Sequence, residues 1–106
     1  MNKAILIGRL TRDPETSYGK KNEGISCAHF TLAVDRRTKD SNADFIPVVT
    51  FGKTAEFVEK YFTKGMKVSV VGRIQTGNYT DKKGETRYTT DVIAEEVEFC
   101  ESKKND

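Results

Sequence analysis

The chain has 106 residues, of which 36% are hydrophobic and 32% are charged, with a formal net charge of +2 at pH 7. This length predicts one domain, and the high charged fraction indicates a core that is thin or that shares apolar surface with another subunit. No apolar run approaches the roughly 20 residues of a membrane span, and the first residues lack the apolar segment and cleavage site of a signal peptide. We therefore expect a cytoplasmic protein without a membrane partner.

Alternation of apolar and polar residues with a period of two dominates the chain and predicts a mainly β protein. Strands are expected over residues 4–10, 26–36, 45–51, 66–75 and 87–99. The first of them is apolar on both faces, with Leu6 on one side and Ile5 and Ile7 on the other. A small barrel has only one interior, so the outer face of such a strand must meet a subunit or a ligand. In the last strand the apolar phase changes near Glu95 and Glu96, which predicts a bulge.

One helix is expected between the third and fourth of these strands. Thr54 is the expected N-cap, Glu56 falls in the first turn, and Gly65 is the expected end. The order of three strands, a helix and two strands predicts an all-β, five-stranded OB-fold barrel. We expect this domain to cover residues 1–100, followed by a short polar end at 101–106.

Three segments of the chain carry a family resemblance: NKAILIGRLTRDPE at residues 2–15, FIPVVTFGK at 45–53 and GRIQTGNYTD at 72–81. In their order and spacing they resemble the bacterial single-stranded DNA-binding protein family, and the resemblance runs from Asn2 to about Phe99. It implies a nucleoid-associated homotetramer that binds and protects single-stranded DNA in replication, recombination and repair, without performing any chemistry. Aromatic faces set among cations are what such binding requires.

Two phenylalanines in the third strand are the main candidates for base stacking. Phe45 and Phe51 are six residues apart, so both point to one face, while Val48 and Thr50 point to the other. The pattern alone favours the phenylalanine face as the core. The resemblance favours the opposite, because the family has stacking aromatics at the positions of Phe45 and Phe51.

Tyrosines and cations complete the expected site. Tyr79, in the expected hairpin loop at 77–84, matches another stacking position, and Tyr18 matches a family aromatic that could instead close the end of the barrel. Lys53 matches a family cation beside a stacking ring. Exposed cations near the aromatics are expected to neutralise phosphate; these candidates are Arg9, Arg37, Lys39, Lys53, Arg73, Lys82 and Lys83.

The chain departs from the family pattern at several positions. Thr38 stands where many members have an aromatic on the arm between the second and third strands, and the chain contains no tryptophan. Arginines of some relatives are replaced at Ser17, Pro47, Gln75 and Gly77. Relatives often continue into a flexible tail that recruits repair proteins, so we expect partners of that tail to be lost. The sequence leaves open whether the chain is a shortened piece or a naturally short member.

An enzyme and another kind of OB-fold module are the two alternatives to DNA binding. An enzyme would need a catalytic cluster, but Cys27 and His29 share a face with Asp35 about 20 Å further along the strand. We expect His29 to be a surface or subunit-contact residue, and Cys27 and Cys100 to be dispensable thiols without metal or cofactor. An OB-fold module that binds RNA or a replication protein is the alternative.

Overall fold

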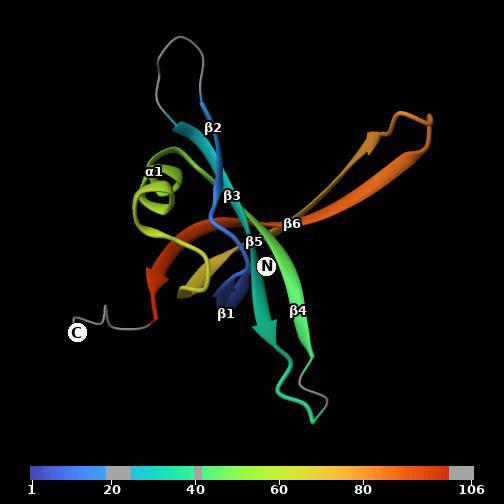
Figure 1. Cartoon of the computed structure of the whole chain (residues 1–106). Helices are drawn as coiled ribbons and strands as arrows, with labels where there is room; N and C mark the ends of the chain where they lie inside the picture. Colours follow the sequence, from blue (N-terminus) through green and yellow to red (C-terminus); the bar gives the residue numbers. More distant parts are fainter. Residues whose placement is uncertain (19–24, 40–41, 101–106) are drawn as a thin grey trace.

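The computed structural model describes residues 1–18, 25–39 and 42–100 of the chain. The strands are β1 (Ala4–Leu10), β2 (Glu15–Tyr18), β3 (Ile25–Asp35), β4 (Ala43–Phe51), β5 (Lys67–Thr80) and β6 (Thr86–Phe99). The single helix α1 (Gly52–Tyr61) lies between β4 and β5 (Figure 1). The expected polar end at 101–106 lies outside the described residues, so the loss of tail-mediated partners stays a prediction.

Five of the strands pair into a closed ring in the order β1, β5, β6, β4, β3, and β3 pairs again with β1. The β4–β6 pairing is parallel, and the other pairings are antiparallel. With one helix between the third and fourth ring strands, this architecture fits the OB-fold, and the predicted all-β class and helix position are confirmed. The short β2, which pairs only with β3, was not predicted.

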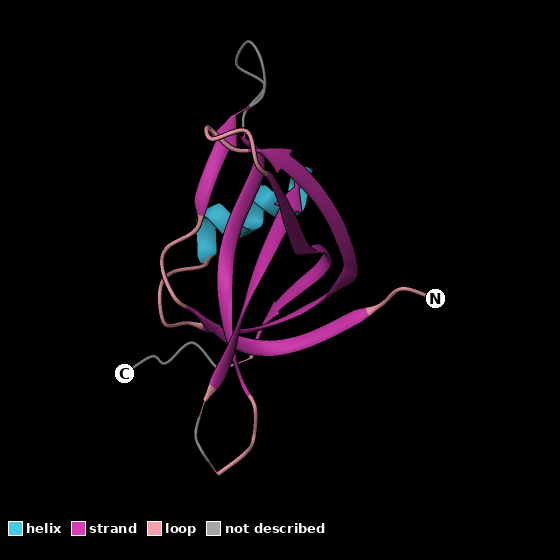
Figure 2. Ribbon diagram, turned by 90° about the vertical axis from the view of Figure 1, so that its right-hand side faces the viewer, coloured by secondary structure: helices cyan, strands magenta, loops and turns pink. Residues whose placement is uncertain are grey.

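The core fills the inside of the ring and the end of it that α1 covers. Leu32, Val48 and Val70 are fully buried, and Phe62 packs edge-on against Phe30 with ring centroids 5.9 Å apart. Figures 1 and 2 show the helix at one end of the strands, with the β3–β4 connection projecting away from it. Buried side chains therefore fill the interior and the end that faces the helix, and the outer faces of the strands are the surfaces accessible to a ligand.

The helix begins earlier than expected. Phe51 is its N-cap and makes no side-chain capping bond, so Thr54 lies inside the helix and no acidic residue occupies the first turn. Gly52 has a φ of +60°, which lets the chain turn sharply from β4 into the helix at this point. Phe62 ends the helix, and Gly65 lies in the turn before β5 instead.

The expected irregularity in the last strand is confirmed. Val71 pairs with Glu96 and Gly72 with Ala94, so Glu95 is the extra residue of a bulge in β6. Beyond the ring, β5 and β6 stay paired out to Thr80 and Thr86. They form a two-stranded projection, here called the ribbon, which consists of residues 75–80, the turn 81–85 and residues 86–91 (Figure 1). The first half of the segment expected to be a hairpin loop, residues 77–80, is thus strand.

Candidate nucleic-acid interface

The outer face of β4 carries the two phenylalanines that the sequence singled out. Phe45 is 65% exposed and Phe51 is 53% exposed, whereas Val48 and Thr50 between them are fully buried. The Thr50 hydroxyl donates to the Ala28 carbonyl at 2.8 Å, which satisfies the only polar side chain in this buried series. The interpretation of the phenylalanine face as core is therefore wrong, because the alternate series fills the ring.

Small neighbours leave both rings open to solvent. Across the β3–β4 ladder Phe45 pairs with Ala33 and Phe51 pairs with Cys27, and cross-strand partners share a face. The side chains of Ala33 and Cys27 are too short to cover a phenyl ring. Cys27 is half-buried and Cys100 is exposed, and both are free thiols. Two flat apolar surfaces about 20 Å apart thus stand on one strand.

His29 joins this face, which the sequence interpretation did not foresee. It pairs with Val49 across the ladder, so it lies between the two phenylalanine positions. Its Nε2 lies 3.4 Å from Oε1 of Glu15 on β2. A hollow of about 480 Å³ beside Phe45 is lined in part by His29 and Arg12. The alternation in β3 together with the β3–β4 register is the signal that places His29 here.

Arg9 reaches the same outer surface from β1. It pairs with Ala33, which in turn pairs with Phe45, so the three residues form a row across three strands. Two strand spacings put Arg9 roughly 10 Å from Phe45. Its Nη1 donates to the Gly65 carbonyl at 2.9 Å, which holds the guanidinium beside the turn before β5.

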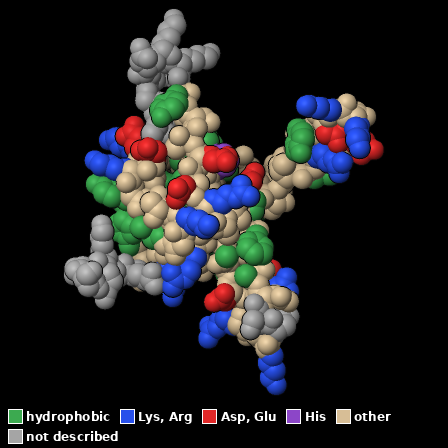
Figure 3. All heavy atoms as spheres, viewed as in Figure 1, with side chains coloured by type: hydrophobic (Ala, Val, Ile, Leu, Met, Phe, Trp, Pro, Cys, Tyr) green, Lys and Arg blue, Asp and Glu red, His purple; other side chains and the backbone are tan. Residues whose placement is uncertain are grey.

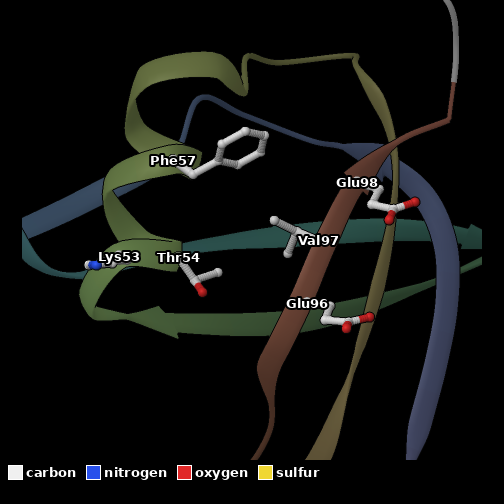
Figure 4. A pocket seen from close by; sticks show the side chains of 6 residues that line it. All are labelled: Lys53, Thr54, Phe57, Glu96, Val97 and Glu98. Atoms are coloured by element: carbon white, nitrogen blue, oxygen red, sulfur yellow. The ribbon is translucent and has the colours of Figure 1, made fainter.

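Lys53 directly follows the phenylalanine strand, on the first turn of α1. It is exposed, and it borders a hollow of about 350 Å³ between the helix and β6. Figure 4 shows Thr54 and Phe57 facing Val97 across this hollow, while the Lys53 ammonium lies on the far side from Glu96 and Glu98. The charge of Lys53 is therefore available next to Phe51, where the positive end of the helix dipole also favours an anion.

Arg73 and Tyr79 lie on one face of β5, because they are six residues apart on the strand. Tyr79 is 56% exposed, and Gly77 beside it on the same face has no side chain to cover the ring. The Arg73 guanidinium donates to Oε1 of Gln75 at 2.8 Å. Tyr79 therefore presents its ring from a strand and not from a loop, with Arg73 nearer the ring of strands.

An aspartate organises the tip of the ribbon. The Asp81 carboxylate accepts hydrogen bonds from the backbone N–H groups of Lys83 and Glu85 and from Nε of Arg87, each at 2.9 Å. The Glu85 N–H and then the Arg87 guanidinium contribute most to holding the pKa of Asp81 below its usual value of 3.8. Lys82 and Lys83 are exposed in this turn, and Lys and Arg side chains gather at the tip of the projecting β5–β6 hairpin (Figures 1 and 3).

The remaining candidates lie at two separate ends of the molecule. Arg37 and Lys39 are exposed beyond the end of β3, and Arg37 adopts a left-handed φ of 64°. The neighbouring Arg36 is paired with Asp44 at 2.9 Å. Tyr18 is 69% exposed at the end of β2, away from the end of β3 where Arg37 and Lys39 lie. The structure thus groups Phe45, Phe51 and Arg9 on one surface and places the other candidates around it.

Neither a metal centre nor a membrane helix is found among the residues that the structure describes. Within 1–18, 25–39 and 42–100, no group of three or more histidine, cysteine, aspartate or glutamate side chains is placed to hold a metal ion. The one helix of that part of the chain is too short and too polar to cross a membrane.

Comparison with known proteins identifies the family. Residues 1–100 match the Single-strand binding protein family. Single-stranded DNA-binding protein 2 of Clostridium acetobutylicum is 55% identical over 104 residues, which cover 95% of this chain and 77% of the relative. Single-stranded DNA-binding protein 1 of the same organism is 46% identical over 98% of this chain and 97% of its own length. Single-stranded DNA-binding protein 1 of Staphylococcus aureus is 44% identical over the whole chain and 69% of the relative. The chain belongs to the Single-strand binding protein family.

Proposed function

We propose that the protein binds single-stranded DNA without sequence preference and protects it during replication, recombination and repair in the cytoplasm, at the nucleoid. The observation that carries the proposal is the outward orientation of Phe45 and Phe51 on a strand whose alternate side chains fill the core. Two phenyl rings held in solvent by a rigid strand are suited to stacking on bases, since every base has a π-face.

In this mechanism, aromatic rings and cations contact different parts of the DNA. Bases stack on Phe45, Phe51 and Tyr79, and the rings do not distinguish one base from another. Phosphates are neutralised by the basic side chains around these rings, which position the strand without reading sequence; these are Arg9, Arg37, Lys39, Lys53, Arg73, Lys82 and Lys83. Tyr18 supplies a further ring at the end of β2. No bond is made or broken, and we assign no enzymatic activity.

The protein acts as a homotetramer in this proposal. Ile5 is 69% exposed and Ile7 is 53% exposed on the outer face of β1, where Ile5 pairs with half-buried Val71. An aliphatic strip without aromatic rings or cations at its centre is suited to a second copy. Sedimentation at micromolar concentration should give the mass of four chains, and the mass of one chain would contradict this assignment.

The deciding experiment is a titration with three nucleic acids of equal length: oligothymidylate, its RNA counterpart and duplex DNA. The chain has four tyrosines and no tryptophan, so tyrosine emission reports stacking directly. We expect strong quenching and the tightest binding with the single-stranded DNA. Preference for the RNA would support the alternative of an RNA-binding module, and equal weak binding of all three would contradict the proposal.

A further inference from the structure

The two faces of the ribbon differ in composition. Cross-strand partners in an antiparallel ladder share a face, and successive pairs alternate between faces. One face carries the pair Tyr79–Arg87. The opposite face carries the pair Asn78–Tyr88, flanked by two pairs of threonines, Thr76–Thr90 and Thr80–Thr86. Each face therefore has one tyrosine, and the two rings point in opposite directions.

Tyr88 stands out by its exposure. It is 80% exposed, compared with 56% for Tyr79 and 65% for Phe45. Among the described residues its ring packs against no other aromatic ring, and its hydroxyl makes no hydrogen bond. By alternation Tyr88 belongs to the same series as Val92, which is only 4% exposed in the core. The series that faces the core in β6 thus continues past the ring of strands and ends in an uncovered aromatic side chain.

The neighbours of Tyr88 fit a nucleic acid better than a protein surface. Threonine hydroxyls and the Asn78 amide surround the ring, whereas the centre of a subunit interface is apolar and densely packed. Hydroxyl and amide groups next to an aromatic ring can hydrogen-bond to phosphate and sugar oxygens. Lys82 and Lys83 lie at the tip where the two faces meet, and their side chains form no ion pair within the described part of the chain. Positive charge at the tip is therefore available to a ligand on either face.

The Tyr88 face is also continuous with the phenylalanine platform. β4 and β6 pair only at Val48–Val92 and Val49–Ile93, and toward the ribbon the two strands separate. An apolar hollow of about 380 Å³ opens in this gap, with Phe45 and Pro47 on one wall and Ile74 and Thr90 on the other. Thr90 is two residues from Tyr88, about 7 Å along the strand. A strand of DNA that leaves Phe45 through this hollow meets Tyr88 next.

We propose that Tyr88 is a second base-stacking platform on the ribbon, on the face opposite Tyr79, so that the ribbon holds single-stranded DNA on both sides. The proposal rests on the function proposed above and extends it to a site outside the predicted set. One subunit then occludes more nucleotides than the Phe45, Phe51 and Tyr79 platforms alone would cover.

The test compares Tyr88→Thr with the same substitution at Tyr61, a 45% exposed tyrosine on the last turn of α1 and outside the proposed site, using oligothymidylates of increasing length. Threonine suits a strand and is already abundant on this face, so the variant is expected to fold like the wild type. For long oligothymidylates we expect Tyr88→Thr to weaken binding about 5- to 150-fold and Tyr61→Thr to change it little. The number of nucleotides occluded per subunit should also fall in Tyr88→Thr. Tyr88→Phe should keep the affinity, because the phenyl ring still stacks. A smaller share of the tyrosine emission should then be quenched, because the tyrosine at position 88 is gone.

The outcomes separate this inference from the proposed function. If Tyr79→Thr loses affinity while Tyr88→Thr binds every length as the wild type does, the second platform is wrong and the proposed function stands. If the wild type does not bind oligothymidylate at all, both fail. If Tyr88→Thr changes the sedimenting mass but not the affinity per subunit, the face contacts another copy of the chain and the inference is overturned.

Discussion

Two outer surfaces of the same ring expose apolar side chains, but of different kinds. The β3–β4 surface presents Phe45 and Phe51 beside small or polar neighbours such as Ala33 and His29. The β1–β5 surface presents the aliphatic Ile5 and Ile7, with β5 partners that bear no aromatic ring. Exposed apolar side chains grouped in this way are unusual on a monomer. The chemistry of the exposed groups indicates a different ligand for each surface. Flat rings next to cations suit bases, and branched aliphatic groups suit close packing against a second protein surface.

The largest effect should come from a charge on the aliphatic surface. Ile7→Glu places a carboxylate where we propose that another copy packs, and burying an unpaired charge is prohibitive. We expect sedimentation to show dissociation to single chains at micromolar concentration, with the far-UV circular dichroism unchanged. Thr63→Glu, which adds the same charge in the turn after α1, should leave the assembly intact. An Ile7→Glu protein of unchanged mass would remove β1 from the subunit interface.

Truncation of one ring tests the aromatic surface. Phe45→Ala should weaken binding of oligothymidylate by about 1–3 kcal/mol, because a stacking platform is lost, while the thermal midpoint stays near that of the wild type. The adjacent buried residue gives the reverse control. Val48→Ala removes buried methyl groups, so it should lower the free energy of unfolding by about 2 kcal/mol with little direct effect on binding. If Phe45→Ala unfolds the protein, Phe45 supports the fold and the contrast between the two surfaces disappears.

Salt dependence distinguishes rings from cations. The affinity for single strands should fall with salt, with a log–log slope of about −0.7 per phosphate neutralised. Lys53→Glu should make that slope shallower by at least one such increment, whereas Tyr79→Ala should lower affinity at every salt concentration without changing the slope. Lys60→Glu on the last turn of α1 is the matched control, since Lys60 lies over the Tyr61 ring, 5.5 Å from its centroid. Equal slopes for wild type and Lys53→Glu would exclude Lys53 from the site.

The smallest effect concerns the tip of the ribbon. Because the pKa of Asp81 is lowered in the folded protein, its ionised form favours the folded tip above the ordinary pKa of 3.8. This contribution is lost as the pH falls through the lowered pKa, so stability should be flat near neutrality and decline only in acid. The carboxylate lies in a surface turn and keeps contact with solvent, with 19% of the side chain exposed, which keeps the effect small.

A substitution isolates this contribution at neutral pH. Asp81→Asn should speed hydrogen exchange at the amides of Lys83 and Glu85, which donate to the carboxylate, whereas Glu85→Gln should not. Unchanged exchange in Asp81→Asn would mean that the turn holds its shape without the carboxylate.

How much the sequence foretold depends on how local each feature is. The alternation around Phe45, Val48 and Phe51 defines the two faces of β4, and only the family resemblance predicted which face is outside. The helix begins at Gly52, before the expected cap Thr54, because the left-handed φ of Gly52 turns the chain out of β4 at that residue. Residues 77–84 were expected to be a hairpin loop, but the pairing of β5 with β6 continues past Gly77 to Thr80 and Thr86. Alternation places Tyr88 in the same series as the buried Val92, and periodicity cannot tell where a strand leaves the core.

The pairing of β1 with β5 has a consequence for how the protein is made. The partner of Ala4–Leu10 on β5 begins only at Lys67, so β1 is synthesised well before the strand that covers its edge. At about 5–20 residues per second this delay lasts several seconds, during which an apolar strand with an unpaired edge is open to wrong partners. Pairings between such distant segments also slow folding. The aliphatic strand thus poses its greatest aggregation risk on the ribosome, before the ring can close.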